Sequence, residues 1–302
     1  MDERARREPQ PQPGFVEQGD YRVTKISASY SRAQLDPMLE VLGAIAVGFA
    51  TGVVKLANLS QVTTLLIIIA SVAYFATMLT SSRVEAIERT RVRAFIPLFI
   101  ANAVFWSLFQ QIFTVLAVYS DERINWTIFG WTAPSSWIGS IEPVWIILLS
   151  PLFAVMWTKL GRRAPTTPRK FAYGVIGMGA AFLLFLPMAG GTGKTVPVIA
   201  VVAIMAAFAI SELMLSPIGL SVTTQLAPNA FRSQMMALYF FSVGLGTAMS
   251  GVLARYYDSA HEAAYFGIIG GAAGAAAGCR PPQPPKRHQA YSASVNTVAG
   301  TK

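Results

Sequence analysis

Residues 211–220, SELMLSPIGL, lie within the long apolar run 195–231, where Glu212 is the only formal charge. A carboxylate near the centre of a bilayer costs about 3 kcal/mol on insertion scales. Such residues are rare and by default mark a substrate or ion pathway. Ser216 follows one helical turn later on the same face, and Pro217 removes a backbone donor and is expected to open the helix for about a turn. We predict a broken membrane helix that presents an acid and a hydroxyl to a polar cavity. The alternative is that Glu212 merely caps a helix or pairs with a neighbour.

The composition is that of a helical membrane protein. Of the 302 residues, 53% are hydrophobic and 13% are charged, and the mean hydropathy is +0.47. A soluble domain carries about 25% charged residues. The net charge of +9 could suggest a nucleic-acid partner, but the basic residues cluster between apolar runs and in the two tails. They are typical of topology determinants and headgroup contacts, so we predict the lipid bilayer as a partner and no nucleic acid.

Few residues offer metal or catalytic chemistry. The single cysteine, Cys279, excludes an internal disulfide and a multi-cysteine metal site. The two histidines, His261 and His288, fall in a loop and in a polar tail, so no histidine metal cluster is expected. No nucleophile–base pair appears either. We therefore predict no metal, no cofactor and no enzyme activity. The polar start of the chain lacks the apolar core of a secretory signal.

The N-terminal third divides into three parts. Residues 1–35 are polar and without periodicity, so we predict disorder. Residues 36–82 contain two apolar runs and are predicted to form a helical hairpin, because a span needs about 20 apolar residues. Residues 83–93 are a charged cytoplasmic linker, in which Glu85 and Arg89 have the i,i+4 spacing of an ion pair.

The rest of the chain alternates between apolar segments and short polar connections. Residues 94–278 are predicted to form a six-helix bundle, and the basic, Pro-rich tail 279–302 is predicted to be disordered. The six apolar segments are approximately 94–120, 142–158, 171–189, 195–226, 233–254 and 263–278.

The connections predict an orientation. The connection 159–170 is the most basic one, and under the positive-inside rule it is cytoplasmic, together with 83–93. The connection 121–141 is then external. Its tryptophans, Trp126, Trp131 and Trp137, are predicted to form an interfacial belt. The glycine-rich stretch 190–195 lacks the glycine spacing of a phosphate-binding loop, so we interpret it as a flexible turn.

Two further polar features lie at predicted spans. Gln110 and Gln111 are adjacent amides in a spanning segment and need partners inside the bundle; interhelical bonding and substrate contact are both open. Glu142-Pro143 is predicted to begin a helix, because proline suits the first turn and an acid there is favoured by the helix dipole.

Three long motifs resemble one known family. They are FWSLFQQ at 105–111, SELMLSPIGLSVTTQLAP at 211–228 and FRSQMMALYFFSVGLGTAMSG at 231–251. They are similar to the C-terminal half of proton-dependent oligopeptide transporters, which belong to the major facilitator superfamily. The resemblance covers roughly 40–278. It implies an all-α membrane protein, namely a C-terminal six-helix bundle preceded by a two-helix hairpin, with multiple passes through the inner (cell) membrane. It also implies a missing N-terminal six-helix bundle as a partner.

The resemblance assigns substrate-binding roles to particular residues. It implies that Glu212 and Ser216 face the amino end of a peptide and that Trp106 lines the pocket. Tyr239 matches a pocket position where the family commonly has tryptophan. Gln110 is also placed among the substrate-binding residues.

Two positions depart from the family pattern. Gln110 stands where members usually carry a proton-coupling glutamate, and Glu142 stands where they usually carry asparagine. The acid has moved from one helix to the next. We therefore predict that Glu142, together with Glu212, carries proton coupling, because two like charges in a low-dielectric cavity repel and favour protonation of at least one of them.

The predicted function follows from this resemblance. The chain is expected to be the C-terminal portion of a proton-coupled di-/tripeptide symporter working by alternating access, with small peptides and protons as its substrates. The alternative is a non-transporting truncated fragment or pseudogene product of such a transporter.

Overall fold

The computed structural model describes residues 43, 47–48, 51–52, 55 and 58–278. Predictions on 1–35, on most of the first hairpin run and on the tail 279–302 lie outside the described residues. The chain divides into two units, Met1–Val54 and Lys55–Lys302. Among the described residues of the first unit, Thr51 Oγ1 donates a hydrogen bond to Val47 O at 2.8 Å.

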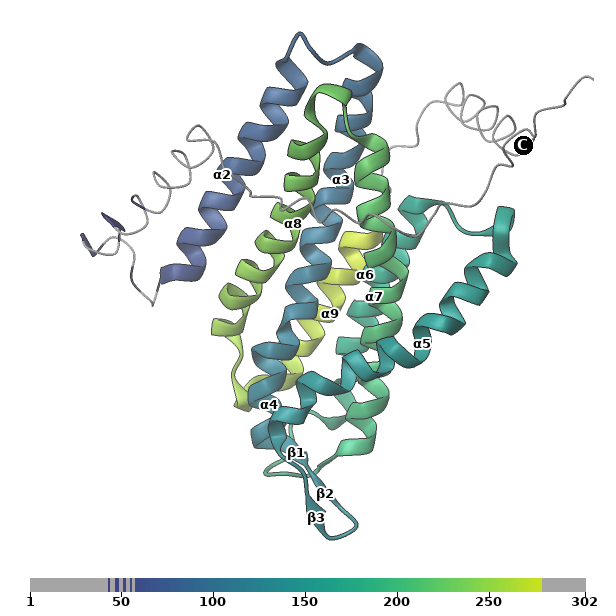
Figure 1. The fold of residues 1–302 in the computed structure, drawn as a ribbon. Helices are drawn as coiled ribbons and strands as arrows, with labels where there is room; N and C mark the ends of the chain where they lie inside the picture. Colours follow the sequence, from purple (N-terminus) through teal and green to yellow (C-terminus); the bar gives the residue numbers. More distant parts are fainter. Residues whose placement is uncertain (1–42, 44–46, 49–50, 53–54, 56–57, 279–302) are drawn as a thin grey trace, which may run out of the picture. The chain divides into compact units, whose positions relative to one another are not determined.

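Helices dominate the second unit (Figure 1). They are α2 (Leu59–Thr80), α3 (Ala86–Phe109), α4 (Val115–Arg123), α5 (Ile138–Leu160), α6 (Thr167–Leu183), α7 (Val198–Leu226), α8 (Arg232–Leu253) and α9 (Glu262–Gly278). Two short pairings complete it: β1 (Ile124–Asn125) runs parallel to β4 (Val196–Pro197), and β2 (Thr127–Ile128) runs antiparallel to β3 (Trp131–Thr132).

Membrane-length helices confirm the predicted class of an all-α membrane protein. Within the described residues, six helical runs are long and apolar enough to cross a bilayer: Leu59–Thr80, Ala86–Arg123, Ser135–Leu160, Arg169–Met188, Val198–Leu226 and Asn229–Tyr256. The last predicted span corresponds to α9, which has 17 residues and is therefore slightly shorter than the others.

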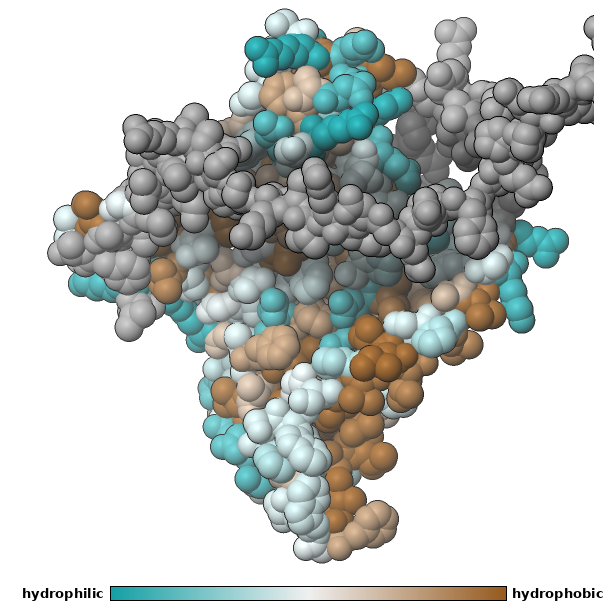
Figure 2. All heavy atoms as spheres, in the orientation of Figure 1, coloured by the Kyte–Doolittle hydropathy of each residue, from teal (hydrophilic) through white to brown (hydrophobic). Residues whose placement is uncertain are grey.

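The core lies where α3, α6, α7, α8 and α9 run side by side (Figure 1). Its centre is aromatic: the rings of Phe182 and Phe208 lie 5.3 Å apart, and those of Phe185 and Phe266 lie 5.1 Å apart. By contrast, α2 and α5 are covered on one side only, and Figure 2 shows apolar side chains gathered over α5. Such faces are stable in lipid, where the surrounding solvent is itself apolar.

Most of the charged stretch 83–93 is helical, because α3 begins at Ala86; its cytoplasmic location stays a prediction. Glu85 caps this helix in a capping box with Glu88, so its carboxylate accepts from the helix rather than from Arg89. Arg89 Nη2 instead donates to Ser81 O at 2.9 Å. The predicted Glu85–Arg89 pair is therefore wrong.

A buried ion pair ties α4 to α9. Arg123 Nε lies 2.7 Å from Glu262 Oε1, and the two side chains are 5% and 1% exposed. The same two residues hold the glycine-rich turn, since Arg123 Nη1 donates to Gly193 O at 3.1 Å and Gly190 N donates to Glu262 Oε2 at 3.4 Å. Gly190 and Gly193 have φ values of 81° and 69°, which glycine adopts without strain. The predicted turn is present, and hydrogen bonds to Arg123 and Glu262 hold it against the bundle.

Candidate functional site

Glu212 and Ser216 open into one cavity on the side of α7. The cavity has a volume of about 290 Å³ and lies between α7 and α5. Its lining is Ile146, Glu212, Leu213, Ser216, Pro217 and Leu220. The two polar groups thus share a face, as their spacing predicts, and most of the remaining lining is aliphatic.

The predicted break in this helix is wrong. α7 is assigned as helix without interruption from Val198 to Leu226, and Pro217 lies inside it. The proline ring withholds the N–H that would bond the carbonyl of Leu213, but the packing of α7 against its neighbours keeps the turn helical. Since Glu212 lies in the middle of α7, the alternative that it caps a helix end is also wrong.

Glu142 reaches the same place from α5. This helix begins at Ile138 rather than at Glu142, so the prediction that Glu142-Pro143 begins a helix is wrong and no acid lies in the first turn. Glu142 is buried, and its carboxyl group lies close enough to that of Glu212 for the two to interact. A hydrogen bond between the two carboxyl groups would require a proton on one of them, because an ionised carboxylate only accepts.

Tyr239 closes the group from α8. Its side chain is buried, and its hydroxyl lies close enough to Ser216 and Glu212 to interact with both. We call Glu142, Glu212, Ser216 and Tyr239 the acidic site. Three helices, α5, α7 and α8, therefore bring together four of the predicted site residues.

Trp106 and Gln110 lie on α3 and at its end, and their described partners are on α8. A Cβ added to Gly246 would lie 2.7 Å from Trp106 Cβ, so α3 and α8 are in close contact here. Trp106 Nε1 is buried and has no hydrogen-bond partner among the described residues. Gln110 Nε2 donates to Thr247 Oγ1 at 3.1 Å.

The neighbouring amide is bonded inside the bundle as well. Gln111 Nε2 donates to Ser107 O at 3.2 Å, and Gln111 Oε1 accepts from Tyr265 Oη at 2.9 Å. The prediction that the adjacent amides find partners within the bundle is thus confirmed. Whether Gln110 also contacts substrate stays a prediction.

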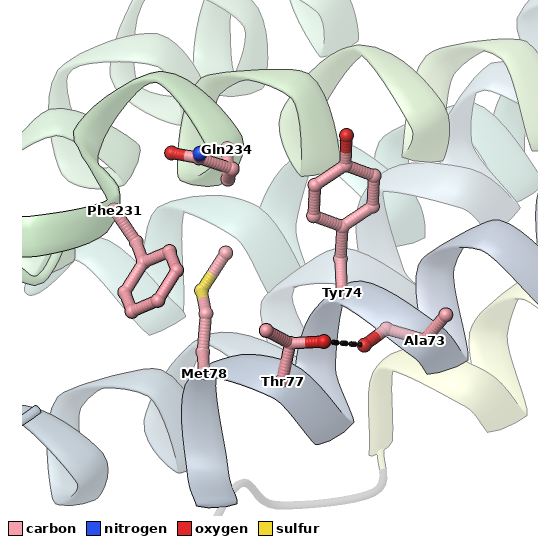
Figure 3. A pocket seen from close by; sticks show the side chains of 6 residues that line it. All are labelled: Ala73, Tyr74, Thr77, Met78, Phe231 and Gln234. Carbon is pink, nitrogen blue, oxygen red and sulfur yellow. Dashed lines mark hydrogen bonds between the residues drawn. The ribbon is translucent and has the colours of Figure 1, made fainter. Parts of the chain in front are cut away.

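A second cavity, of about 220 Å³, lies between α2 and α8 (Figure 3). The only hydrogen bond drawn within it joins Thr77 Oγ1 to Ala73 O at 2.8 Å, so this hydroxyl is already engaged. Its lining carries no charge and consists of Ala73, Tyr74, Thr77, Met78, Phe231 and Gln234. Nothing in it resembles the acidic site.

The apolar wall of the acidic site is the part that the sequence reading missed. Ile146 lies one turn after Glu142 on α5, and this spacing within the predicted segment 142–158 was the signal that could have placed it beside the acid. For metal binding, the described residues contain no group of three or more His, Cys, Asp or Glu that could hold an ion.

Two neighbouring carboxyl groups, one of them buried, lie within the spans of a multi-pass helical bundle. Membrane proteins with such groups form a class in which these groups mark a pathway for substrates or ions. The model of the POT family matches residues 51–270, and the chain belongs to this family.

Similar proteins agree with this placement. The chain is 38% identical over 228 residues to an uncharacterized transporter of Bacillus subtilis, which covers 75% of this chain and 46% of that protein. It is 38% identical over 219 residues to a di-/tripeptide transporter of Lactococcus lactis, covering 70% and 44%. The chain thus spans about half the length of the curated relatives it matches.

Solved structures give the same picture. A mutant of a POT peptide transporter in complex with alafosfalin has a TM-score of 0.74 at 39% identity and covers 82% of this chain and 51% of that one. A POT family transporter in complex with 5-aminolevulinic acid has a TM-score of 0.72 at 30% identity and covers 82% and 53%. The helical architecture is therefore that of half of such a transporter.

Proposed function

We propose that this chain forms the C-terminal portion of a proton-coupled di-/tripeptide symporter of the inner membrane, which works by alternating access. Membership of the POT family supports peptide transport, since relatives of similar sequence are named as di-/tripeptide transporters. The observation that carries the proton-coupled part is the close approach of the carboxyl groups of Glu142 and Glu212.

The acidic site is suited to the amino end of a peptide. A buried carboxylate is tolerated when it is paired, and a peptide ammonium is a natural partner for Glu212. Ser216 and Tyr239 supply hydroxyl oxygens beside it. In the whole transporter Trp106 and Gln110 would line the same central cavity, where the unpartnered indole N–H of Trp106 is available to a ligand.

The carboxyl pair couples proton binding to peptide binding, because a proton and a peptide ammonium each neutralise negative charge at the same two groups. With the site empty, one proton held between Glu142 and Glu212 avoids two buried negative charges. When an ammonium enters beside Glu212, its positive charge favours the ionised form of both carboxyl groups, and the proton is released. Because linkage is reciprocal, protonation weakens the binding of the ammonium by the same factor.

The test replaces Glu142 in a complete transporter that carries these residues. We expect Glu142→Gln to abolish proton-driven accumulation of a labelled dipeptide, whereas peptide counterflow, which needs no net proton movement, survives. Ser140→Ala, one half-turn before it on an exposed position, serves as the control and should leave both activities unchanged. Normal accumulation by Glu142→Gln would show that the acid has no coupling role.

A second arrangement tests whether the acid has moved between helices. Restoring the family pattern with Gln110→Glu and Glu142→Asn together should regain accumulation that either single change lacks. An acid at 110 can be bonded locally, because the hydroxyl of Thr247, which now accepts from the Gln110 amide and donates to Val243 O, can turn and donate to a carboxylate instead. An inactive double variant that still folds and binds peptide would contradict the exchange.

The alternative is a non-transporting truncated fragment or pseudogene product. It is favoured by one observation, namely that the chain covers 46% and 44% of the first two relatives. Uptake of a labelled dipeptide into proteoliposomes distinguishes the two.

A further inference from the structure

Gly219 and Tyr239 fit together so closely that a larger residue at 219 would displace the ring. A Cβ built on Gly219 would lie 2.8 Å from Cε2 of Tyr239 and 3.3 Å from its hydroxyl oxygen. Real Cβ atoms essentially never come within 3.0 Å of another heavy atom. The Cζ atom of Phe171, in α6, lies 3.4 Å from the same point. Rings from two other helices therefore meet α7 at this glycine.

The contact between Gly219 and Tyr239 lies next to the acidic site on α7. Gly219 follows Ser216 by three residues and Glu212 by seven, so all three lie on one face of α7. The phenol ring lies against α7 at Gly219, and its hydroxyl lies close enough to Ser216 to interact with it. The absence of a side chain at 219 thus sets how closely the hydroxyl can approach Ser216.

Tyr239 has little room to retreat. Ser242 Oγ donates to the backbone oxygen of Tyr239 at 2.6 Å, and Asn102 Nδ2 donates to Ser242 Oγ at 2.6 Å. This chain of hydrogen bonds fixes the turn of α8 that carries Tyr239 against α3. Phe171 of α6, which is 3% exposed, also lies close to Gly219. A methyl group at 219 would therefore be accommodated by rotating the phenol away from Ser216.

We propose that Gly219 is a positioning residue of the acidic site: it admits the Tyr239 ring against α7 and so holds the hydroxyls of Tyr239 and Ser216 beside Glu212. This proposal rests on the function proposed above. The subsite binds a primary ammonium group next to a small aliphatic side chain, because Ile146, Leu213 and Leu220 form the rest of its wall.

Stability measurements on the purified 302-residue chain in detergent test the contact. Alanine is ordinarily better than glycine inside a helix, so a loss must come from the ring. Gly219→Ala should lower the Tm when Tyr239 is present and should leave it unchanged or raise it in a Tyr239→Leu background. Gly271→Ala in α9, where no atom lies within 4 Å of the added Cβ, should behave alike in both backgrounds.

The same measurement is decisive if a variant does not fold. Should Gly219→Ala alone fail to fold, the double variant with Tyr239→Leu must fold, because the obstructing ring is gone. An equal loss of Tm, or an equal failure to fold, in both backgrounds would overturn the proposal.

Fluorine NMR tests the link to Ser216 without any ligand. The chain is labelled with 3-fluorotyrosine, and the Tyr239 signal is assigned by its absence in Tyr239→Phe. Ser216→Ala should shift this signal in the wild-type background and should have no further effect once Gly219→Ala is present. If Ser216→Ala shifts the signal equally with and without Gly219→Ala, then Gly219 does not position the hydroxyl.

Transport by a complete transporter separates this inference from the function on which it rests. Gly219→Ala should raise the KM for alanyl-alanine by about tenfold, as expected for the loss of one hydrogen bond near a charged group, with kcat unchanged within about twofold. An unchanged KM for Gly219→Ala while Tyr239→Phe raises it would overturn the positioning role. If neither variant changes KM, the proposed ammonium subsite is wrong, whatever the NMR result for Gly219.

Discussion

At the scale of single residues, identical side chains in one connection have different roles. The sequence predicts an interfacial belt of three tryptophans in 121–141. In the structure Trp126 is 5% exposed, and its Nε1 donates to the backbone and side-chain oxygens of Ser120, both at 3.2 Å. Trp131 and Trp137 are 54% and 50% exposed, and their rings lie 5.4 Å apart. For Trp126 the belt prediction is wrong; for the other two it stands as a prediction.

Because of these two environments, replacing each kind of tryptophan with alanine should lower the free energy of unfolding by a different amount. Trp126→Ala should destabilise the chain by about 3–5 kcal/mol, because it leaves a cavity in the core. Trp131→Ala should change the stability by less than about 0.5 kcal/mol in detergent, since an exposed ring loses little packing. Thermal unfolding of both variants in one detergent measures the difference. Equal effects of the two substitutions would mean that the environments are not distinct.

Single residues also mark the limit of prediction from sequence. The spacing of Glu212 and Ser216 on one helical face predicts their shared cavity, and the structure has it. The contact between Glu142 and Glu212 depends on where α5 begins. A proline at position 143 suggests a helix start, but the chain already turns into 3₁₀ geometry at Ser135 and continues as α-helix from Ile138, so tertiary packing decides the boundary and not local propensity.

At the scale of helices, apolar run length predicts where the spans are but not how their ends are joined. The start of α3 extends into a charged stretch because Glu85 and Glu88 satisfy the free N–H groups of its first turn. Glu88 also accepts from the backbone N–H of Asn229 at 3.0 Å, which ties the start of α3 to the connection between α7 and α8. The tie between Arg123 and Glu262 joins residues far apart in the chain, and no local pattern reveals it.

The ion pair between α4 and α9 predicts that a glutamine substitution at Glu262 lowers the stability far more than the same substitution at an exposed glutamate nearby. Glu262→Gln should destabilise the chain by about 3–5 kcal/mol, because it leaves the buried guanidinium of Arg123 without its counter-charge. The matched change Glu122→Gln, at an exposed acid next to Arg123 in the sequence, should have an effect below about 1 kcal/mol.

Thermal unfolding of the two glutamine variants measures this difference. Replacing both partners, Arg123→Met with Glu262→Met, should cost less than the sum of the two single changes, because no charge is then left unpaired. Additive losses would indicate that the two side chains do not interact.

At the scale of the whole molecule, the distribution of basic residues predicts the orientation in the membrane. We expect the connection 159–170 to be cytoplasmic and 121–141 to be external. Single cysteines at Thr166 and Ser136, both exposed in the structure, would be introduced in a Cys279→Ser background and probed with an impermeant thiol reagent on intact cells. Labelling should occur at 136 and not at 166. The opposite pattern would reverse the orientation.

The purified chain, when it is tested alone, presents its acidic site on one helical bundle only. The cavity of the acidic site lies on the side of α7, with Ile146 of α5 as its remaining lining residue. Alternating access requires a second wall that rocks against the first about a central site, and the chain spans about half of its relatives. Polar groups of the acidic site that face lipid without partners would each cost several kcal/mol. We therefore expect no concentrative uptake of a labelled dipeptide by proteoliposomes containing only the purified 302-residue chain, whereas a full-length POT family transporter in the same preparation accumulates it. Uptake driven by a proton gradient in the single-chain vesicles, abolished by Glu212→Gln, would show that a second copy of this chain can supply the opposing wall, and it would refute the prediction.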